Sequence, residues 1–383
     1  MSGDKKETEQ TYAYTPGLKI KESNVISKLR RLPIPGEVLV KEGDEIQPDT
    51  VVAETLLPGD PEIVPAMMKL GITPEGLPSC MLVKIGDHVK EGDIIARYSM
   101  FFGLIKRELA SPISGTVEVV SELTGQLIMR GEDIPVRVDA YIPGKIIKVI
   151  PEEGVVIETK GAFIQGIFGI GGERQGELRV AVESPESTLT AEMLSPEDKG
   201  KVLVGGGLLT LDALRKAVDL GVSGIIVGGI DSGDLMEFMG AGIGVAITGE
   251  EEYGTTLIVT EGFGAMTMHK KTFSIFKKYN GSNVSINGAT QIRAGVIRPE
   301  VVIPHSETVD EAGEDAAISA GMVPGTPIRI IRNPYFGAIG EVVSLPIELQ
   351  VVETGSKVRV LEALLEDGRK VIVPRANVEI IEE

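Results

Sequence analysis

Alternating apolar and polar residues dominate the first half of the chain. The segments 35–46 and 81–96 repeat one pattern, in which alternating apolar positions are combined with Gly-Asp pairs. Alternation is typical of half-buried strands, and glycine supplies the positive φ that tight turns need. We therefore predict strands and turns throughout residues 32–183.

The hydrophobic pattern changes after residue 200. Short apolar runs without alternation are typical of strands covered on both faces, as in a parallel sheet between helices. Such runs occupy residues 201–204, 224–227, 244–247 and 256–260.

Helix signals separate these apolar runs. Thr210 is placed to cap a helix over 211–220, and Gly221 is placed to end it. Further helices are predicted over 235–239 and 267–279. Strands alternating with helices predict a Rossmann-like α/β domain.

These patterns divide the chain into three folded domains. A stretch rich in Ser, Thr, Pro and Glu marks a boundary near residue 184. The predicted fold class is multidomain α/β plus β, with the α/β domain in the centre. The predicted boundaries are a partly disordered N-terminal lead at 1–30, a β-rich domain at 31–183, a linker at 184–198, the α/β domain at 199–304, a connector at 305–320 and a β-barrel at 321–383.

Residues 110–117, Ala-Ser-Pro-Ile-Ser-Gly-Thr-Val, are similar to the strand after the modified hairpin in biotinyl and lipoyl carrier domains. The resemblance implies a barrel-sandwich hybrid fold, with an acceptor lysine about seven residues before the alanine. Gly103 stands there, between Phe102 and Leu104, whereas Lys106 falls three positions later and is predicted to lie in a strand. The sequence therefore predicts the fold without biotin or lipoate. RnfC-type and NqrA-type redox subunits carry similar non-carrier domains, but one cysteine cannot supply the cluster ligands of RnfC-type subunits, so electron transfer is not implied.

Residues 325–343 resemble the KOW motif of NusG-type transcription factors and some ribosomal proteins. The resemblance implies a small SH3-like barrel that binds RNA or docks on protein. Arg332, Tyr335 and Phe336 are its candidate contacts, because aromatic side chains in such a loop can stack on bases or meet a partner. The alternative is that Phe336 packs into the barrel.

The composition limits the functions open to the whole chain. Formal net charge is −18 and pI is about 4.8, so non-specific binding to polyphosphate or anionic membranes is not expected. The single Cys80 excludes a disulfide framework within the chain. No apolar run reaches the length of a membrane span and the N-terminus does not resemble a signal peptide, so a soluble cytoplasmic protein is expected.

Glycine-rich loops are predicted at the carboxyl ends of the parallel strands, where such sheets bind ligands. These loops carry acidic residues but no Lys or Arg, so a nucleotide would need Mg²⁺ held by Asp231 and Asp234. The alternative is that the acidic residues cap helices.

A Glu261–His269 acid–base pair is conceivable. Arg293 and Arg298 are expected to form structural ion pairs or to meet an acidic partner. No catalytic or metal site is predicted. The candidate ligand residues are Gly205, Gly206, Gly207, Gly228, Gly229, Asp231, Ser232, Asp234, Glu261, Gly262 and His269.

The leading hypothesis is a non-enzymatic adaptor or assembly factor that docks on a larger cytoplasmic complex. The apolar hairpin containing Phe101 and Phe102 would be its contact if it is exposed. One alternative is a transcription- or translation-associated factor that binds RNA, RNA polymerase or the ribosome through the C-terminal barrel. The other is a small-molecule or nucleotide sensor, or an enzyme, that uses the central glycine-rich loops.

Overall fold

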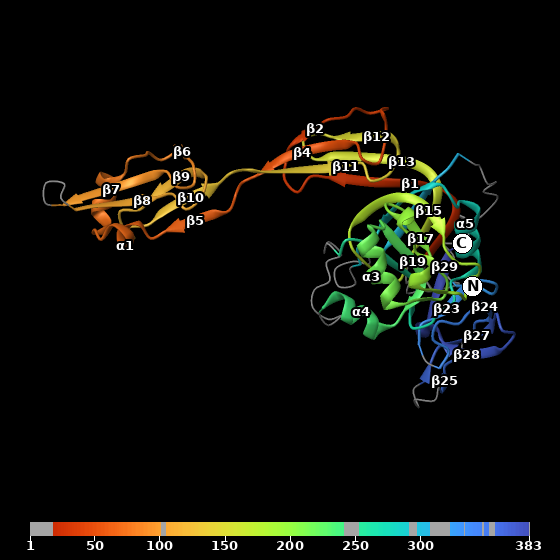
Figure 1. The fold of residues 1–383 in the computed structure, drawn as a ribbon. Coiled ribbons are helices and arrows are strands. Elements are labelled where there is room, and N and C mark those ends of the chain that lie inside the picture. Colours follow the sequence, from red (N-terminus) through yellow and green to blue (C-terminus); the bar gives the residue numbers. More distant parts are fainter. Residues whose placement is uncertain are drawn as a thin grey trace, which may run out of the picture.

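The computed structural model describes residues 18–100, 105–240, 253–290, 297–306, 322–332, 334–346, 348–351 and 357–382. The protein is β-rich, with one large mixed sheet of 18 strands and four smaller sheets among the described residues. Figure 1 shows an elongated molecule in which an outer lobe stands away from the rest of the chain.

The outer lobe, residues 61–131, is a compact β unit. Its four-stranded sheet has the order β5-β10-β9-β6, and β7 and β8 form an antiparallel hairpin beside it. Its elements are β5 (Pro61–Val64), α1 (Ala66–Leu70), α2 (Leu77–Cys80), β6 (His88–Val89), β7 (Ile94–Met100), β8 (Ile105–Ala110), β9 (Gly115–Val120) and β10 (Leu127–Gly131).

The strands on either side of the outer lobe form the inner β region. The ribbon β4–β11 leads out to the lobe, and β1 pairs with β13 along most of its length. The strands are β1 (Leu18–Arg31), β2 (Glu37–Val38), β3 (Glu45–Ile46), β4 (Val51–Leu57), β11 (Ile134–Asp139), β12 (Gly144–Ile150) and β13 (Gly154–Gln165).

The N-terminal boundary differs from the prediction. Residues 18–30 were expected to belong to a lead, but they lie in β1, where Leu18, Ile20 and Ile26 are buried. β1 also pairs in parallel with the last strand, through Leu18 and Ile381. The local sequence did not indicate this strand because its partners lie far along the chain.

Three Gly-Asp turns share one geometry, which confirms the turns predicted from their sequence. Each glycine has a φ between 90° and 95°. Each aspartate carboxylate accepts a hydrogen bond from the backbone N–H three residues earlier, at 2.7–2.8 Å. The turns span Lys41–Asp44 in the inner β region and Lys84–Asp87 and Lys90–Asp93 in the outer lobe.

The central region contains the parallel part of the large sheet. β15, β17, β19 and β20 are parallel neighbours, while β14 runs antiparallel beside β20. β21 and β22 are antiparallel and connect this region to β15 and β13. The elements are β14 (Phe168–Ile170), β15 (Glu173–Val180), β16 (Thr188–Leu189), β17 (Val202–Val204), β18 (Leu208–Leu209), α3 (Leu211–Leu220), β19 (Gly224–Ile230), α4 (Ser232–Met239), β20 (Thr256–Phe263), α5 (Lys270–Lys278), β21 (Asn283–Asn287) and β22 (Glu300–Pro304).

Local signals predicted much of this region. Strands were expected near β17, β19 and β20, and helix α3 has its predicted bounds, with the Thr210 side chain accepting from Ala213 N and Gly221 in the left-handed conformation. Helix α4 begins earlier than predicted, at Ser232, and α5 begins later, at Lys270. β15 was assigned to the first domain but pairs with β17. The strand predicted at 244–247 lies outside the described residues.

The C-terminal unit is an antiparallel sheet with its own buried core. β23, β24, β27 and β28 follow one another in the sheet, and β29 pairs with β23. Ile328, Val342 and Leu361 are among the buried side chains of this core. The strands are β23 (Pro327–Ile330), β24 (Ile339–Ser344), β25 (Gln350–Val351), β26 (Lys357–Val358), β27 (Val360–Leu365), β28 (Lys370–Pro374) and β29 (Val378–Glu382).

None of the helices in the described parts of the chain is both long and apolar enough to cross a bilayer.

Candidate functional site

The predicted glycine-rich loops are packed against neighbouring backbone. Gly228, Gly229 and Gly262 lie within β19 and β20 rather than in loops. The amides of several candidate glycines are already paired: Gly205 N donates to Ile226 O at 2.8 Å, Gly207 N to Ser187 O at 2.8 Å and Gly228 N to Gly206 O at 2.7 Å. These amides therefore stabilise the fold and are not left to bind an anion.

The missing side chains of these glycines make room for other parts of the chain. A Cβ atom on Gly228 would lie 2.1 Å from the carbonyl oxygen of Met266, and one on Gly229 would lie 2.1 Å from that of Gly264. A Cβ atom on Gly206 would lie 2.4 Å from Ser187 O. Residues 264–268 therefore fill the end of the parallel strands, where a ligand was predicted.

The acidic residues after β19 form the first turn of α4. One Asp231 oxygen accepts from Gly233 N at 2.7 Å and from Asp234 N at 3.4 Å. Ser232 and Asp234 are the first and third residues of that helix. The helix-cap alternative is therefore confirmed for Asp231.

Glu261 is buried and paired with a cation that the sequence did not associate with it. Its Oε2 lies 2.9 Å from Nη1 of Arg329, which comes from β23 of the C-terminal unit. The other Arg329 nitrogen, Nη2, lies 3.0 Å from Glu379, and Glu379 also pairs with Arg298. The structural ion pair expected of Arg298 is confirmed, whereas Arg293 lies outside the described residues.

His269 does not form the acid–base pair that was considered. Its backbone N–H, rather than its ring, donates to Glu261 Oε1 at 3.0 Å. The ring is almost fully buried, and its Nδ1 has no hydrogen-bond partner. Both residues are buried, and the contact holds the start of α5 against β20.

The candidate contacts of the C-terminal unit lie between β23 and β24. Arg332 is exposed, and Phe336 is 46% exposed. The Phe336 ring reaches Gly262, since a Cβ atom there would lie 3.5 Å from the ring. Tyr335 packs against the buried core of the unit, and the Arg369 guanidinium lies 5.6 Å from its ring centre. Arg332 and Phe336 therefore remain accessible, whereas Tyr335 is partly covered.

The prediction that Lys106 lies in a strand is confirmed in the hairpin of the outer lobe, whereas position 103 lies outside the described residues. β7 and β8 pair, and Lys106 lies inside β8 opposite Ser99. The candidate contacts Phe101 and Phe102 lie between these strands but outside the described residues.

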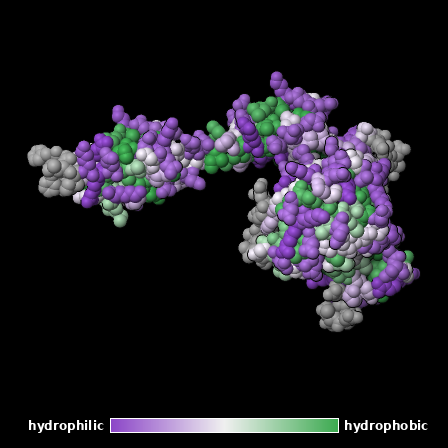
Figure 2. Space-filling view, viewed as in Figure 1, coloured by the Kyte–Doolittle hydropathy of each residue, from purple (hydrophilic) through white to green (hydrophobic). Residues whose placement is uncertain are grey.

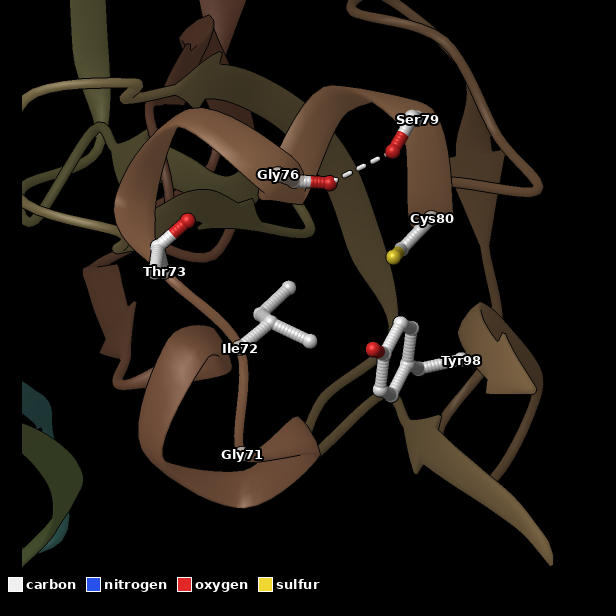
Figure 3. Close-up of a pocket in the computed structure, with 7 residues that line it drawn as sticks. All are labelled: Gly71, Ile72, Thr73, Gly76, Ser79, Cys80 and Tyr98. Carbon is white, nitrogen blue, oxygen red and sulfur yellow. Dashed lines mark hydrogen bonds between the residues drawn. The ribbon is translucent and has the colours of Figure 1, made fainter. Parts of the chain in front are cut away.

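A pocket that sequence reasoning missed lies in the outer lobe (Figure 3). It has a volume of about 470 Å³ and is lined by Gly71, Ile72, Thr73, Gly76, Ser79, Cys80 and Tyr98. Cys80 is buried in α2 and its sulfur points into the pocket, while the Ser79 hydroxyl donates a hydrogen bond to Gly76 O at 2.7 Å. The lining holds no His, Lys, Arg, Asp or Glu, and its titratable side chains are Cys80 and Tyr98. Three short segments form the pocket together, and none of them has a motif of its own.

The inner β region contains a buried tyrosine with a perturbed pKa. Tyr141 is 2% exposed and has a φ of 69°, a left-handed conformation that is uncommon for a residue other than glycine. Burial raises the pKa of its hydroxyl well above the ordinary value, and the negative charges of Glu300 and Glu173 raise it further. Those carboxylates pair with Lys28 and Arg30 of β1, which indicates a structural cluster that joins β1 to β22 and β15.

Tyr141 is expected to keep its proton in the folded protein above pH 10. The unfolded chain then binds fewer protons than the folded one, so stability falls as pH rises above about 10. The chain has seven tyrosines and no tryptophan, so tyrosinate absorbance reports their ionisation directly. Wild type and Tyr141→Phe should titrate alike while folded, and wild type should ionise one more tyrosine in urea. An extra ionisation in folded wild type near pH 10 would contradict this.

The described residues contain no group of three or more His, Cys, Asp or Glu side chains arranged to hold a metal ion. No protein-family model matches the chain, and no curated protein shows significant similarity to it.

Proposed function

We propose that the protein is a non-enzymatic adaptor that docks on a larger complex in the cytoplasm through its outer lobe. The observation that carries this proposal is the position of the lobe, which stands away from the main body and includes the β7–β8 hairpin (Figure 1). A lobe with its own core can be presented to a partner without disturbing the main body.

The proposed fold assignments agree with this function. We propose that the outer lobe and inner β region form a barrel-sandwich hybrid without a carrier lysine, and that no biotin or lipoate is attached. The parallel strands β15, β17, β19 and β20 are proposed to be a Rossmann-like unit. The C-terminal unit is proposed to be an SH3-like KOW barrel, a module that also docks on proteins.

The experiment is affinity purification of the tagged full chain from its native lysate, with mass spectrometry before and after nuclease treatment. We expect a stoichiometric protein partner that survives nuclease and is lost in the Phe101→Ser/Phe102→Ser variant. Leu123→Ser is the control, because Leu123 is a 92% exposed apolar side chain in the β9–β10 turn of the same lobe. Equal recovery of the partner with the double variant would contradict docking through the hairpin.

RNA binding through the C-terminal unit is a second candidate function, and the exposure of Arg332 and Phe336 favours it. Arg329 cannot contribute, because it is buried in ion pairs. In the same purification, RNA that is recovered with wild type and lost with Arg332→Ala/Phe336→Ala would support this function. Loss of the protein partners after nuclease would then favour it over direct protein docking.

A further inference from the structure

We propose that the outer lobe moves as a rigid arm about a hinge at Gly59 and Gly131. The inference rests on the proposed docking function and adds the way in which the lobe would reach its partner. Two neck links, residues 58–60 and 132–133, join the lobe to the rest of the chain; Gly59 lies in the first link, and Gly131 is the last residue of β10, directly before the second.

The outer lobe has an independent core. Its buried cluster includes Leu70, Ile95, Leu109 and Met129, and every buried member lies between residues 64 and 129. The nearest core of the inner β region is a separate cluster that includes Ile26, Val52 and Ile142. A unit with its own close-packed core moves as one body, since repacking that core is costly.

The neck connects these two cores and contributes no residue to the buried cluster of either. Sheet pairing in β4–β11 ends at Leu57 and Ile134, and the sheet of the lobe begins at Pro61 and Gly131. The exposed fractions of Leu56 and Ile134 are 58% and 49%, and Figure 2 shows apolar surface at this place. β2 pairs with β4 only at Ala53 and Glu54, so β4 and β11 form a two-stranded ribbon beyond that point, next to the neck. An isolated two-stranded ribbon is marginally stable in water, so bending there is less costly than in a packed sheet.

The two hinge glycines lie against each other. A Cβ atom on Gly59 would be 2.4 Å from Glu132 O and 2.5 Å from the carbonyl carbon of Gly131. Two hydrogen bonds hold this crossing, from Gly131 N to Asp60 O at 3.0 Å and from Arg130 Nη1 to Gly59 O at 3.2 Å. Both bonds lie on the lobe side of the N–Cα bond of Gly59 and of the Cα–C bond of Gly131, so rotation about these two backbone bonds keeps them intact. Glycine has the widest range of accessible φ and ψ, which favours rotation here.

The chain provides a substitution that should stiffen the hinge without distorting it. A Cβ atom on Gly131 would have no neighbour closer than Asp60 O at 3.4 Å, an ordinary contact. Gly131→Ala therefore fits the structure while removing backbone freedom. Gly172→Ala is the matched control, because a Cβ atom there would have no neighbour within 4 Å and Gly172 is far from the neck in sequence.

The experiment measures distance distributions between spin labels in the full chain. Cys80→Ala removes the only native cysteine, and labels are placed at Ser27→Cys in β1 and Lys90→Cys in the lobe, both exposed positions. A second labelled pair, Lys90→Cys and Leu123→Cys, lies entirely within the lobe. We expect the distribution between lobe and β1 to be at least about twofold broader than that within the lobe, and narrower with Gly131→Ala but not with Gly172→Ala.

Equal widths for the two pairs in the wild-type background would overturn the hinge. An unchanged broad distribution in Gly131→Ala would place the motion elsewhere and overturn the role of Gly131. Either result is distinguishable from failure of the docking function, which is tested by loss of the partner in the Phe101→Ser/Phe102→Ser variant.

Discussion

Replacement of Arg329 by methionine is expected to lower the free energy of unfolding by about 3–5 kcal/mol. Arg329 is 2% exposed and pairs with both Glu261 and Glu379. It also donates to the backbone carbonyl of Thr260 at 3.1 Å. Methionine preserves apolar volume but leaves Glu261 buried without its cation, and an unpaired buried charge is strongly destabilising.

Urea unfolding followed by circular dichroism would measure this effect. Arg97→Met is the matched control, because the Arg97–Glu108 pair has a comparable N–O distance of 2.8 Å but its side chains are 44% and 41% exposed. An exposed pair contributes at most about 1 kcal/mol. If Arg329→Met were no more destabilising than Arg97→Met, the ion pair would not hold the C-terminal unit against β20. Adding Glu261→Gln should recover part of the loss by removing the unpaired charge.

Substitution of Gly228 by alanine is expected to lower the free energy of unfolding by about 3 kcal/mol. The added Cβ would lie 2.1 Å from Met266 O and 2.9 Å from Met268 N, both backbone atoms. These residues cannot move freely, because Met266 N donates to Gly207 O and Met268 N to Pro185 O. The new methyl group must therefore displace a segment that is held at both ends.

Gly172→Ala is again the control, and its effect should stay within about 0.5 kcal/mol. Thermal unfolding of the two variants beside wild type gives the comparison. If Gly228→Ala were as stable as wild type, residues 266–268 would not be packed against β19 as described. The end of the parallel strands would then be open to a ligand, as the glycine-rich sequence predicts.

For the glycines of the central region, the function predicted from the sequence differs from the contacts found in the structure. The sequence predicts a ligand-binding site at Gly205–Gly207 and Gly228–Gly229, because glycine permits close approach of any group to the backbone. The group that approaches Gly228 is the protein's own chain at Met266 and Met268. Composition cannot distinguish these cases, because a ligand and a crossing chain both require the absence of a side chain.

The Arg329–Glu261 pair shows a second limit of the sequence. The central loops contain no Lys or Arg of their own, and the partner considered for Glu261 is His269. The cation that pairs with Glu261 is 68 residues away, in a unit whose position against β20 no local pattern encodes. The same limit applies to the pocket at Cys80, whose lining residues come from segments without a shared motif.

Features that depend on near neighbours along the chain could be predicted from the amino-acid sequence. The Gly-Asp turns and the Thr210 cap of helix α3 each involve hydrogen bonds over three residues, so their geometry follows from local residue types. Three features are visible only in the folded chain: β1 pairs with both β13 and β29, Arg329 of the C-terminal unit pairs with Glu261, and two links connect the outer lobe to the rest of the chain. These features depend on contacts between distant segments, whose free energy comes from burial and charge pairing in the folded chain.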